Sequence, residues 1–478
     1  MIAALAIVPF LVGLAIFALP RSSGAAARAI GVVVSLFVLV GAFVGAGYSD
    51  EATPWFAHPF VASFHVGIGG VSLWLVALLG LITACAAALT RVPQTRDLVA
   101  QLLLLEGSMA GLFIARDLLL FALFWDLMLV PVFLVLVAAP SSAGSAWRYL
   151  IYNLAGGLAL LLGVAAYGMI AGTTDVIGRN GALAPIPAVA AAAIFGALAF
   201  AFAVKTPVWP LHTWMPDTYC DLPPPLVAVV SAIQSKAGLY GLLAVGYPLF
   251  AGPAAAAAPV FIVLGLVGLF YGAFTALVLD DAKRVVAYSS LSHLGLILFA
   301  LASGDPLARA GALIYIVAHA LFSAGLFLVL GEVEQREETR SLSRLGGLGG
   351  RDPRLAGALL IVSLAALGLP GLCGFAGELT MLIGTYRSGL HWETALALVA
   401  VVLAAAYFVR FFQMAMHGPE LSDLPVRPDL HLLEIAALAP LVIAFVVIGV
   451  APGLLLGRPL DAPVTAGTNA ALALGVHR

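Results

Sequence analysis

The feature that most restricts how this chain can fold is a succession of long apolar runs that fills almost the whole sequence. Counted as stretches able to cross about 30 Å of hydrocarbon, the runs predict about fourteen transmembrane helices. Only 10% of the residues are charged, whereas a soluble domain carries about 25%. The first run, residues 1–20, lacks a basic leader and is long enough to span, which favours a membrane helix over a cleaved signal. We therefore predict an all-α polytopic membrane protein.

The few charges and cysteines argue against several other classes. A net charge of -2 does not fit nucleic-acid binding, which requires clustered Lys and Arg, so we expect no nucleic-acid partner. Cys85, Cys220 and Cys373 lie too far apart for a CxxC or metal-ligand spacing. No nucleotide, flavin or cluster motif occurs either. We expect no metal and no cofactor on this chain.

Basic residues are distributed unevenly among the expected loops. Most of them follow odd-numbered apolar runs, which the positive-inside rule assigns to the cytoplasm. Both termini would then lie on the non-cytoplasmic side of the membrane. Residues 50–70 are polar and aromatic enough to form an extramembrane loop, and residues 332–354 form the longest charged stretch.

Four ionisable residues fall within apolar runs: Lys205, Lys236, Asp126 and Glu378. An ionised group at membrane depth costs about 2.5–3.5 kcal/mol on insertion scales, so it usually faces the protein interior and marks an ion path. A simpler alternative stays open for each of them. A buried pair can tie two helices together, and a lysine near a helix end can extend to the interface.

Prolines and glycines accompany two of these residues and predict broken helices near residues 205–210 and 370–374. Broken helices at ion sites tend to occupy matching positions of internal repeats. The spacing of the two breaks fits two inverted five-helix repeats. The predicted division of the chain is N-terminal helices in 1–94, a first repeat in 95–250, a second repeat in 252–416, and a C-terminal helix and tail in 417–478.

Several blocks of the sequence occur in an order that resembles a known family. They include FWDLMLVPVF, AFAVKTPVWPLHTWMPD, SKAGLYGLL, DDAKRVVAYSSLSHLGLI, AHALFSAGLFLVLGEVEQREETR, GLPGLCGFAGELTMLIG and AAYFVRFFQ. Together they are similar to the antiporter-like membrane subunits of respiratory complex I. The FWDLMLVP block and the acid Glu378, where the L and N types usually carry lysine, resemble the M type, which corresponds to mitochondrial subunit 4.

The resemblance implies a proton path along the middle of the membrane. Its expected members are Asp126, which pairs with Lys205, then Lys236, His293, His319 and Glu378. Either histidine could instead be a hydrogen-bonded packing residue. Asp126 is one methylene shorter than the glutamate usual in the family, so its contact with Lys205 can be longer or indirect. The roles of Glu106 and Arg410 stay open.

The resemblance also implies a larger assembly in a bacterial inner membrane. Flavin, iron–sulfur clusters and quinone would belong to partner subunits, and the membrane partners would be L-type and N-type subunits together with small membrane subunits. Two related classes remain as alternatives: a Mrp-type cation/proton antiporter subunit and a membrane subunit of an energy-converting hydrogenase. A scaffold without transport is the third alternative, and the intramembrane charges argue against it.

Overall fold

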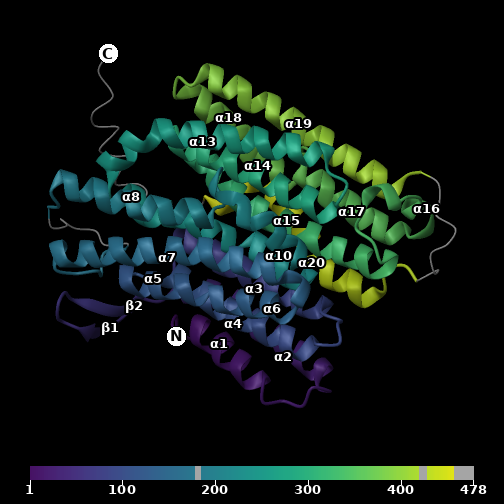
Figure 1. Cartoon of the computed structure of the whole chain (residues 1–478), viewed down its shortest axis with the longest axis horizontal. Helices are drawn as coiled ribbons and strands as arrows, with labels where there is room; N and C mark the ends of the chain where they lie inside the picture. Colours follow the sequence, from purple (N-terminus) through teal and green to yellow (C-terminus); the bar gives the residue numbers. More distant parts are fainter. Residues whose placement is uncertain (178–184, 419–427, 457–478) are drawn as a thin grey trace.

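The computed structural model describes residues 1–177, 185–418 and 428–456, which form a bundle of helices (Figure 1). The helices in chain order are α1 (Ala4–Ile16), α2 (Gly24–Gly45), α3 (Gly70–Leu89), α4 (Thr95–Ile114), α5 (Leu118–Leu127), α6 (Leu129–Ala138), α7 (Ala143–Ala171), α8 (Ala188–Lys205), α9 (Met215–Asp221), α10 (Pro224–Ala232), α11 (Ala237–Gly241), α12 (Tyr247–Leu249), α13 (Ala251–Val278), α14 (Ala282–Ala302), α15 (Pro306–Glu337), α16 (Leu348–Arg351), α17 (Pro353–Ala366), α18 (Cys373–Arg387), α19 (His391–Met416) and α20 (Leu432–Val450).

Length and composition qualify twelve helices of the described residues as candidate membrane spans, and α1 and α17 are shorter apolar helices. The predicted polytopic helical membrane protein is therefore confirmed. The two predicted breaks also occur. α8 ends at Lys205 and the chain resumes helical structure in a short turn at Leu211–Trp214, and residues 367–372 separate α17 from α18.

A β-hairpin stands where the sequence predicted an extramembrane loop. β1 (Glu51–Phe56) pairs antiparallel with β2 (Ala62–Val66). The Glu51 carboxylate accepts from the backbone N–H of Ile2 at 2.7 Å, which ties the hairpin to the start of the chain. The aromatic and alternating residues of this segment suit a small sheet outside the bilayer. The all-α description holds for the membrane domain, to which this hairpin is added.

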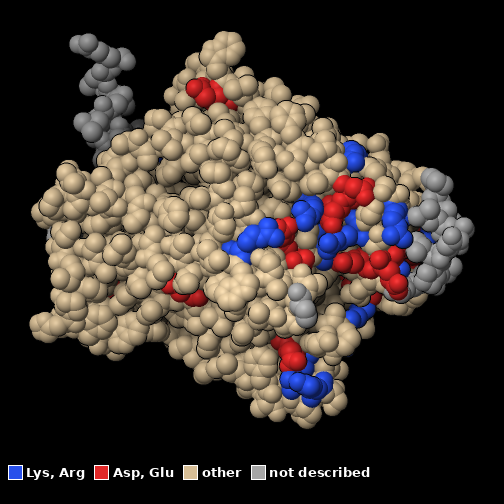
Figure 2. Space-filling model, in the orientation of Figure 1, with Lys and Arg blue, Asp and Glu red and all other residues tan. Residues whose placement is uncertain are grey.

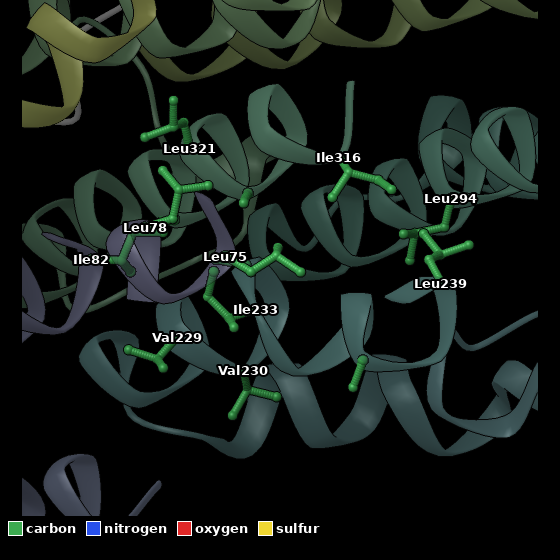
Figure 3. Close-up of a cluster of buried hydrophobic side chains, with 14 of the residues drawn as sticks. Leu75, Leu78, Ile82, Val229, Val230, Ile233, Leu239, Leu294, Ile316 and Leu321 are labelled. Carbon is green, nitrogen blue, oxygen red and sulfur yellow. The ribbon is translucent and has the colours of Figure 1, made fainter. Parts of the chain in front are cut away.

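The interior of the bundle is built around α3, α10 and α15. Side chains of these helices and of α11 and α14 pack into one apolar cluster, which includes Leu75, Val229 and Leu321 (Figure 3). The most apolar windows of α15 and of the segment Pro224–Leu249 are buried throughout, whereas less than half of the window is buried in α2, α13, α19 and α20. Groups on α10, α11 and α15 are therefore shielded from lipid by the rest of this chain.

Charged side chains gather at one end of the molecule. Figure 2 shows Lys and Arg interleaved with Asp and Glu toward the end that carries α16. Arg336 near the end of α15 pairs with Glu332 and with Glu434 of α20, the latter at 2.7 Å. Lys283 at the start of α14 pairs with Glu334 at 2.7 Å. The ends of α15 and α20 are thus fixed by ion pairs, and the opposite ends of α14 and α15 lie away from this network.

Candidate functional site

Asp126 lies at the first of several helix interruptions inside the bundle. It is the next-to-last residue of α5, and α6 begins three positions later at Leu129. Its carboxylate lies against Gly157 of α7, so closely that a Cβ on this glycine would collide with Oδ1. The missing side chain on α7 is what leaves room for the acid.

Lys205 is the last residue of α8 and is 1% exposed. Its Nζ has no hydrogen-bond partner, and neither has Oδ1 of Asp126. Nζ instead lies 5.1 Å from the ring centroid of Trp125, where the aromatic face attracts the cation. No hydrogen bond joins Lys205 to Asp126 in this structure. The direct pairing that the family resemblance implies is therefore not made here, in keeping with the shorter side chain of Asp126.

Lys236 lies in a third interruption, which the sequence did not reveal. A 3₁₀ turn, Gln234–Lys236, separates α10 from α11. The turn lets Nζ of Lys236 donate to the carbonyl oxygen of Ser231 at 2.7 Å and to Oγ of Ser235 at 3.1 Å. The Ser231 hydroxyl accepts from Oγ of Ser323 on α15 at 3.0 Å. Lys236 is thus held by a small group of serines and not by a carboxylate.

Glu378 and His293 are joined by a tyrosine. The hydroxyl of Tyr315 on α15 donates to Oε1 of Glu378 on α18. The hydroxyl oxygen of Tyr315 also lies 2.6 Å from Nδ1 of His293 on α14. Because the hydroxyl proton is directed at Glu378, Nδ1 of His293 must carry the proton of its own hydrogen bond. Three side chains from three helices therefore form one continuous hydrogen-bonded chain inside the protein.

A second glycine makes room for Glu378. Gly368, in the break between α17 and α18, has a φ of +80°, and a Cβ there would collide with Oε2 of Glu378. This backbone conformation is one that residues with side chains rarely adopt. Glu378 and Asp126 are thus alike in one respect: each carboxylate is seated against a glycine of a neighbouring segment.

His319 lies on α15 between Tyr315 and Ser323, which contacts the serines around Lys236. Its ring is edge-on to that of His293 with centroids 5.6 Å apart, and both of its nitrogens are buried without a hydrogen-bond partner. Tyr315, His319 and Ser323 are spaced four residues apart on α15, so they share one face and follow one another at about 6 Å along the axis. This face of α15 runs from the serines around Lys236 to Glu378.

Tyr315 was missed by the sequence reasoning although a signal for it exists. In IYIVAHALFSAGL, the spacing Tyr-x3-His-x3-Ser places three polar side chains on one stripe of an otherwise apolar helix. The serines around Lys236 gave no such signal, because a serine bound to the carbonyl one turn earlier is common in any buried helix.

The structure shows the contacts of Glu106 and Arg410, whose roles the sequence left open. Glu106 is fully buried on α4 and accepts from Oγ of Ser35 on α2 at 2.8 Å, while its other oxygen has no partner. Its hydrogen bonding does not extend to the residues described above. Arg410 of α19 donates to the carbonyl oxygen of Leu279 at 3.0 Å, just past the end of α13. A cation there complements the negative end of the helix dipole.

The hairpin carries a separate charged group around His65. Nδ1 of His65 on β2 lies 2.6 Å from Asp175, and Nε2 lies 3.6 Å from Asp50. These two carboxylates raise the pKa of His65 to about 9 against the desolvation that lowers it, and the hydrogen bond with Asp175 is the largest cause.

Within the described residues, no group of three or more His, Cys, Asp or Glu side chains is arranged to hold a metal ion.

A polytopic bundle whose buried lysines and carboxylates lie at helix interruptions defines an ion-translocating class of membrane protein. The family model described as "NADH:quinone oxidoreductase/Mrp antiporter, TM" matches residues 115–404. The NADH-quinone oxidoreductase subunit M of Escherichia coli K12 is 33% identical over 420 residues, which cover 84% of this chain and 82% of the relative. This chain therefore belongs to the NADH:quinone oxidoreductase/Mrp antiporter transmembrane family.

Solved structures agree with the family assignment. A chain of respiratory complex I from Thermus thermophilus superposes with a TM-score of 0.88 at 29% identity, covering 98% of this chain and 99% of its own length. A chain of the Mrp complex from Dietzia superposes with a TM-score of 0.84 at 20% identity, covering 98% of this chain and 96% of its own. The second likeness concerns the fold alone.

Proposed function

We propose that this protein is an M-type, proton-translocating membrane subunit of an NADH:quinone oxidoreductase. Relatives named subunit M at 33% identity over most of the chain support the parent complex. The observation that carries proton translocation is the hydrogen-bonded chain His293, Tyr315 and Glu378 in a lipid-shielded interior. A carboxylic acid reached through a tyrosine hydroxyl can receive and release protons.

The chain at Glu378 would carry a proton in one balanced step. Tyr315 gives its hydroxyl proton to Glu378 while its oxygen takes the proton from Nδ1 of His293, so the tyrosine ends neutral and Glu378 becomes protonated. For this step to leave the ring neutral, Nε2 of His293 must first take up a proton, so that His293 gives its Nδ1 proton as an imidazolium and keeps the one on Nε2. On this path His319, the adjacent ring on α15, supplies that proton after receiving one from the Lys236 side. The direction of transfer is set by which end of α15 is loaded first.

The Lys205 end would act as the loading site. A fully buried ammonium without a hydrogen-bond partner is costly, and Asp126 is the acid available to neutralise it. Closing the gap between Asp126 and Lys205 favours the charged lysine, and opening it favours release of the proton toward Lys236. The interruption of α5 next to Asp126 gives that acid the freedom to move.

The two breaks would also be the centres of two related halves. α8 ends beside Lys205 in the first predicted repeat, and α17 and α18 are separated beside Glu378 in the second. Half-helices of this kind recur in transporters built from inverted repeats. We keep the repeat boundaries 95–250 and 252–416 as part of the proposal.

The energy for transport would come from partners. In this proposal flavin, iron–sulfur clusters and quinone belong to other subunits, and L-type, N-type and small membrane subunits flank this chain in a bacterial inner membrane. The charged end with Arg336 and Lys283 would face the cytoplasm by the positive-inside rule, which leaves the N-terminus on the other side.

Lys205→Ala in the assembled complex tests the function. Inverted membrane vesicles are driven with NADH, and the acidification rate is compared with the rate of NADH oxidation. Lys283→Ala, which removes a lysine from the ion pair with Glu334, is the matched control. We expect pumping to fall in Lys205→Ala and to persist in Lys283→Ala with equal amounts of assembled complex. Unchanged pumping in Lys205→Ala would overturn the proposed path.

A further inference from the structure

A cavity of about 290 Å³ opens at the end of the bundle opposite the charged network. It lies between α12, the start of α13 and the turn that joins α14 to α15. Most of its wall is apolar, and the lining includes Leu243, Ala251, Ala254, Ala255, Ala258 and Leu301. The cavity exceeds by roughly twentyfold the ~10–15 Å³ that one water requires, so it has room for a molecular group. The alanines of α13 leave this space because they fill so little of it.

The cavity contains one cation, Arg309 of α15. Its guanidinium carbon lies 5.1 Å from the ring centroid of Tyr247, which also lines the cavity. Nε of Arg309 and the hydroxyl of Tyr247 are both buried without a hydrogen-bond partner. Two unpartnered polar groups therefore lie together in a mostly apolar pocket.

No carboxylate among the described residues forms an ion pair with Arg309. The nearest acid along the chain, Asp305, caps α15 and accepts from the N–H groups of Leu307 at 2.7 Å and Ala308 at 3.2 Å. By contrast, Arg336 at the other end of the same helix is paired with two carboxylates. Because an arginine stays ionised in proteins, the pocket presents an uncompensated positive charge.

We propose that this pocket binds the phosphate head group of an anionic phospholipid. A guanidinium recognises phosphate with paired hydrogen bonds, and Tyr247 offers a further donor beside it. On α13 the face that carries Ala254, Ala255 and Ala258 continues one turn further to Ile262, which is partly exposed, so an acyl chain can lie along it. Basic pockets between transmembrane helices bind lipid head groups in this way. The inference does not depend on the function proposed above.

Native mass spectrometry of the full-length protein in detergent tests this site. The protein is titrated with phosphatidylglycerol, with phosphatidylcholine and with inorganic phosphate, and the occupancy of each is compared. Arg387→Gln is the matched control. Arg387 is the last residue of α18 and lies at the same end of the bundle, because Gly384 of α18 packs against Ala308 of α15. Arg387 does not line the cavity. Ala255→Leu is a second variant that fills the cavity and retains Arg309.

We expect phosphatidylglycerol to bind more tightly than phosphatidylcholine, and Arg309→Gln to weaken it roughly fivefold, the factor expected for the loss of one basic group. Ala255→Leu should weaken it as well, and Arg387→Gln should leave it unchanged. Equal binding of both lipids, or equal loss in Arg309→Gln and Arg387→Gln, would overturn the proposal. If inorganic phosphate bound and phosphatidylglycerol did not, the lipid proposal would be overturned and the pocket would be assigned to the free ion.

Discussion

The two ends of the buried polar path differ in how completely their groups are paired. At the Glu378 end, the acid, Tyr315 and His293 already form an unbroken chain of hydrogen bonds. At the Lys205 end, Nζ of Lys205 and Oδ1 of Asp126 have no partner. A buried polar group without a partner is costly, so the Lys205 end is the part of the path that a small movement can change. We infer that regulation of transfer lies at Lys205 and that the Glu378 end acts as a fixed conductor.

Glu378→Gln should have the largest effect, because the amide keeps the volume and removes the proton acceptor. A positioned proton acceptor contributes roughly 10²–10⁴-fold to a transfer, so we expect NADH-driven pumping to fall at least about tenfold. The rate of vesicle acidification measures the pumping. Glu393→Gln, which makes the same substitution at the start of α19, is the control. Retained pumping in Glu378→Gln would contradict the conducting role of this end.

Tyr315→Phe should have the next largest effect. It preserves the ring between α14 and α18 and removes only the hydroxyl that joins His293 to Glu378. Pumping should drop several-fold, while the loss of this hydroxyl costs about 1 kcal/mol of stability. Tyr167→Phe is the matched control, because Tyr167 of α7 is also buried but packs against Phe250, away from these three residues. If both variants reduced pumping equally, the tyrosine would have no special place in the path.

Gly157→Ala probes the Lys205 end through Asp126. A Cβ at Gly157 would collide with the carboxylate, whereas a Cβ at the adjacent Gly156 would meet Val204 at an ordinary 3.4 Å. We expect Gly157→Ala to displace Asp126 and to lower pumping by about threefold, on the order of 0.7 kcal/mol in barrier. Gly156→Ala should pump normally. The comparison fails if the two alanine variants behave alike.

His65 of the hairpin should affect the stability of the fold without affecting proton transfer. His65 has a folded pKa of about 9 against an ordinary 6.5, so its charged form stabilises the fold. That contribution is fully present below about pH 6.5 and is lost as the pH rises through about 9. The melting temperature of the native protein should therefore fall toward that of His65→Gln over this interval, by a few degrees at most. A pH-independent difference between the two would show that His65 acts only through packing.

The helical membrane architecture followed from the sequence because a chain in lipid must satisfy its backbone hydrogen bonds within each segment. The breaks at Lys205 and before Glu378 were predictable because proline and glycine, which interrupt helices, mark both of them. The 3₁₀ turn at Lys236 and the interruption after Asp126 were not predicted, because no proline marks the first and Pro131 lies beyond the second. They depend on tertiary contacts, such as the serines that receive Lys236.

The predicted site residues were found at helix interruptions or facing one another, and the contacts among them were not specified by the sequence. The resemblance implied that Asp126 pairs with Lys205 through a contact that can be longer or indirect, and no hydrogen bond joins the two side chains. Their distance depends on the packing of α5 and α8, which spacing along the chain does not determine. Tyr315 was absent from the prediction because a tyrosine in an apolar helix is usually a packing residue. The transport roles of Asp126, Lys205, Lys236, His293, His319 and Glu378 stay predictions.

The most direct test of a single path through both ends is the double variant Lys205→Ala with Glu378→Gln. Pumping per NADH oxidised is measured in vesicles for the two single variants and the double variant, with complex assembly matched. Residues that act in series on one path are strongly non-additive, so we predict that the double variant pumps no less than the weaker single variant. A double variant that pumps clearly less than either single variant would show that the two residues act independently, and would contradict the account.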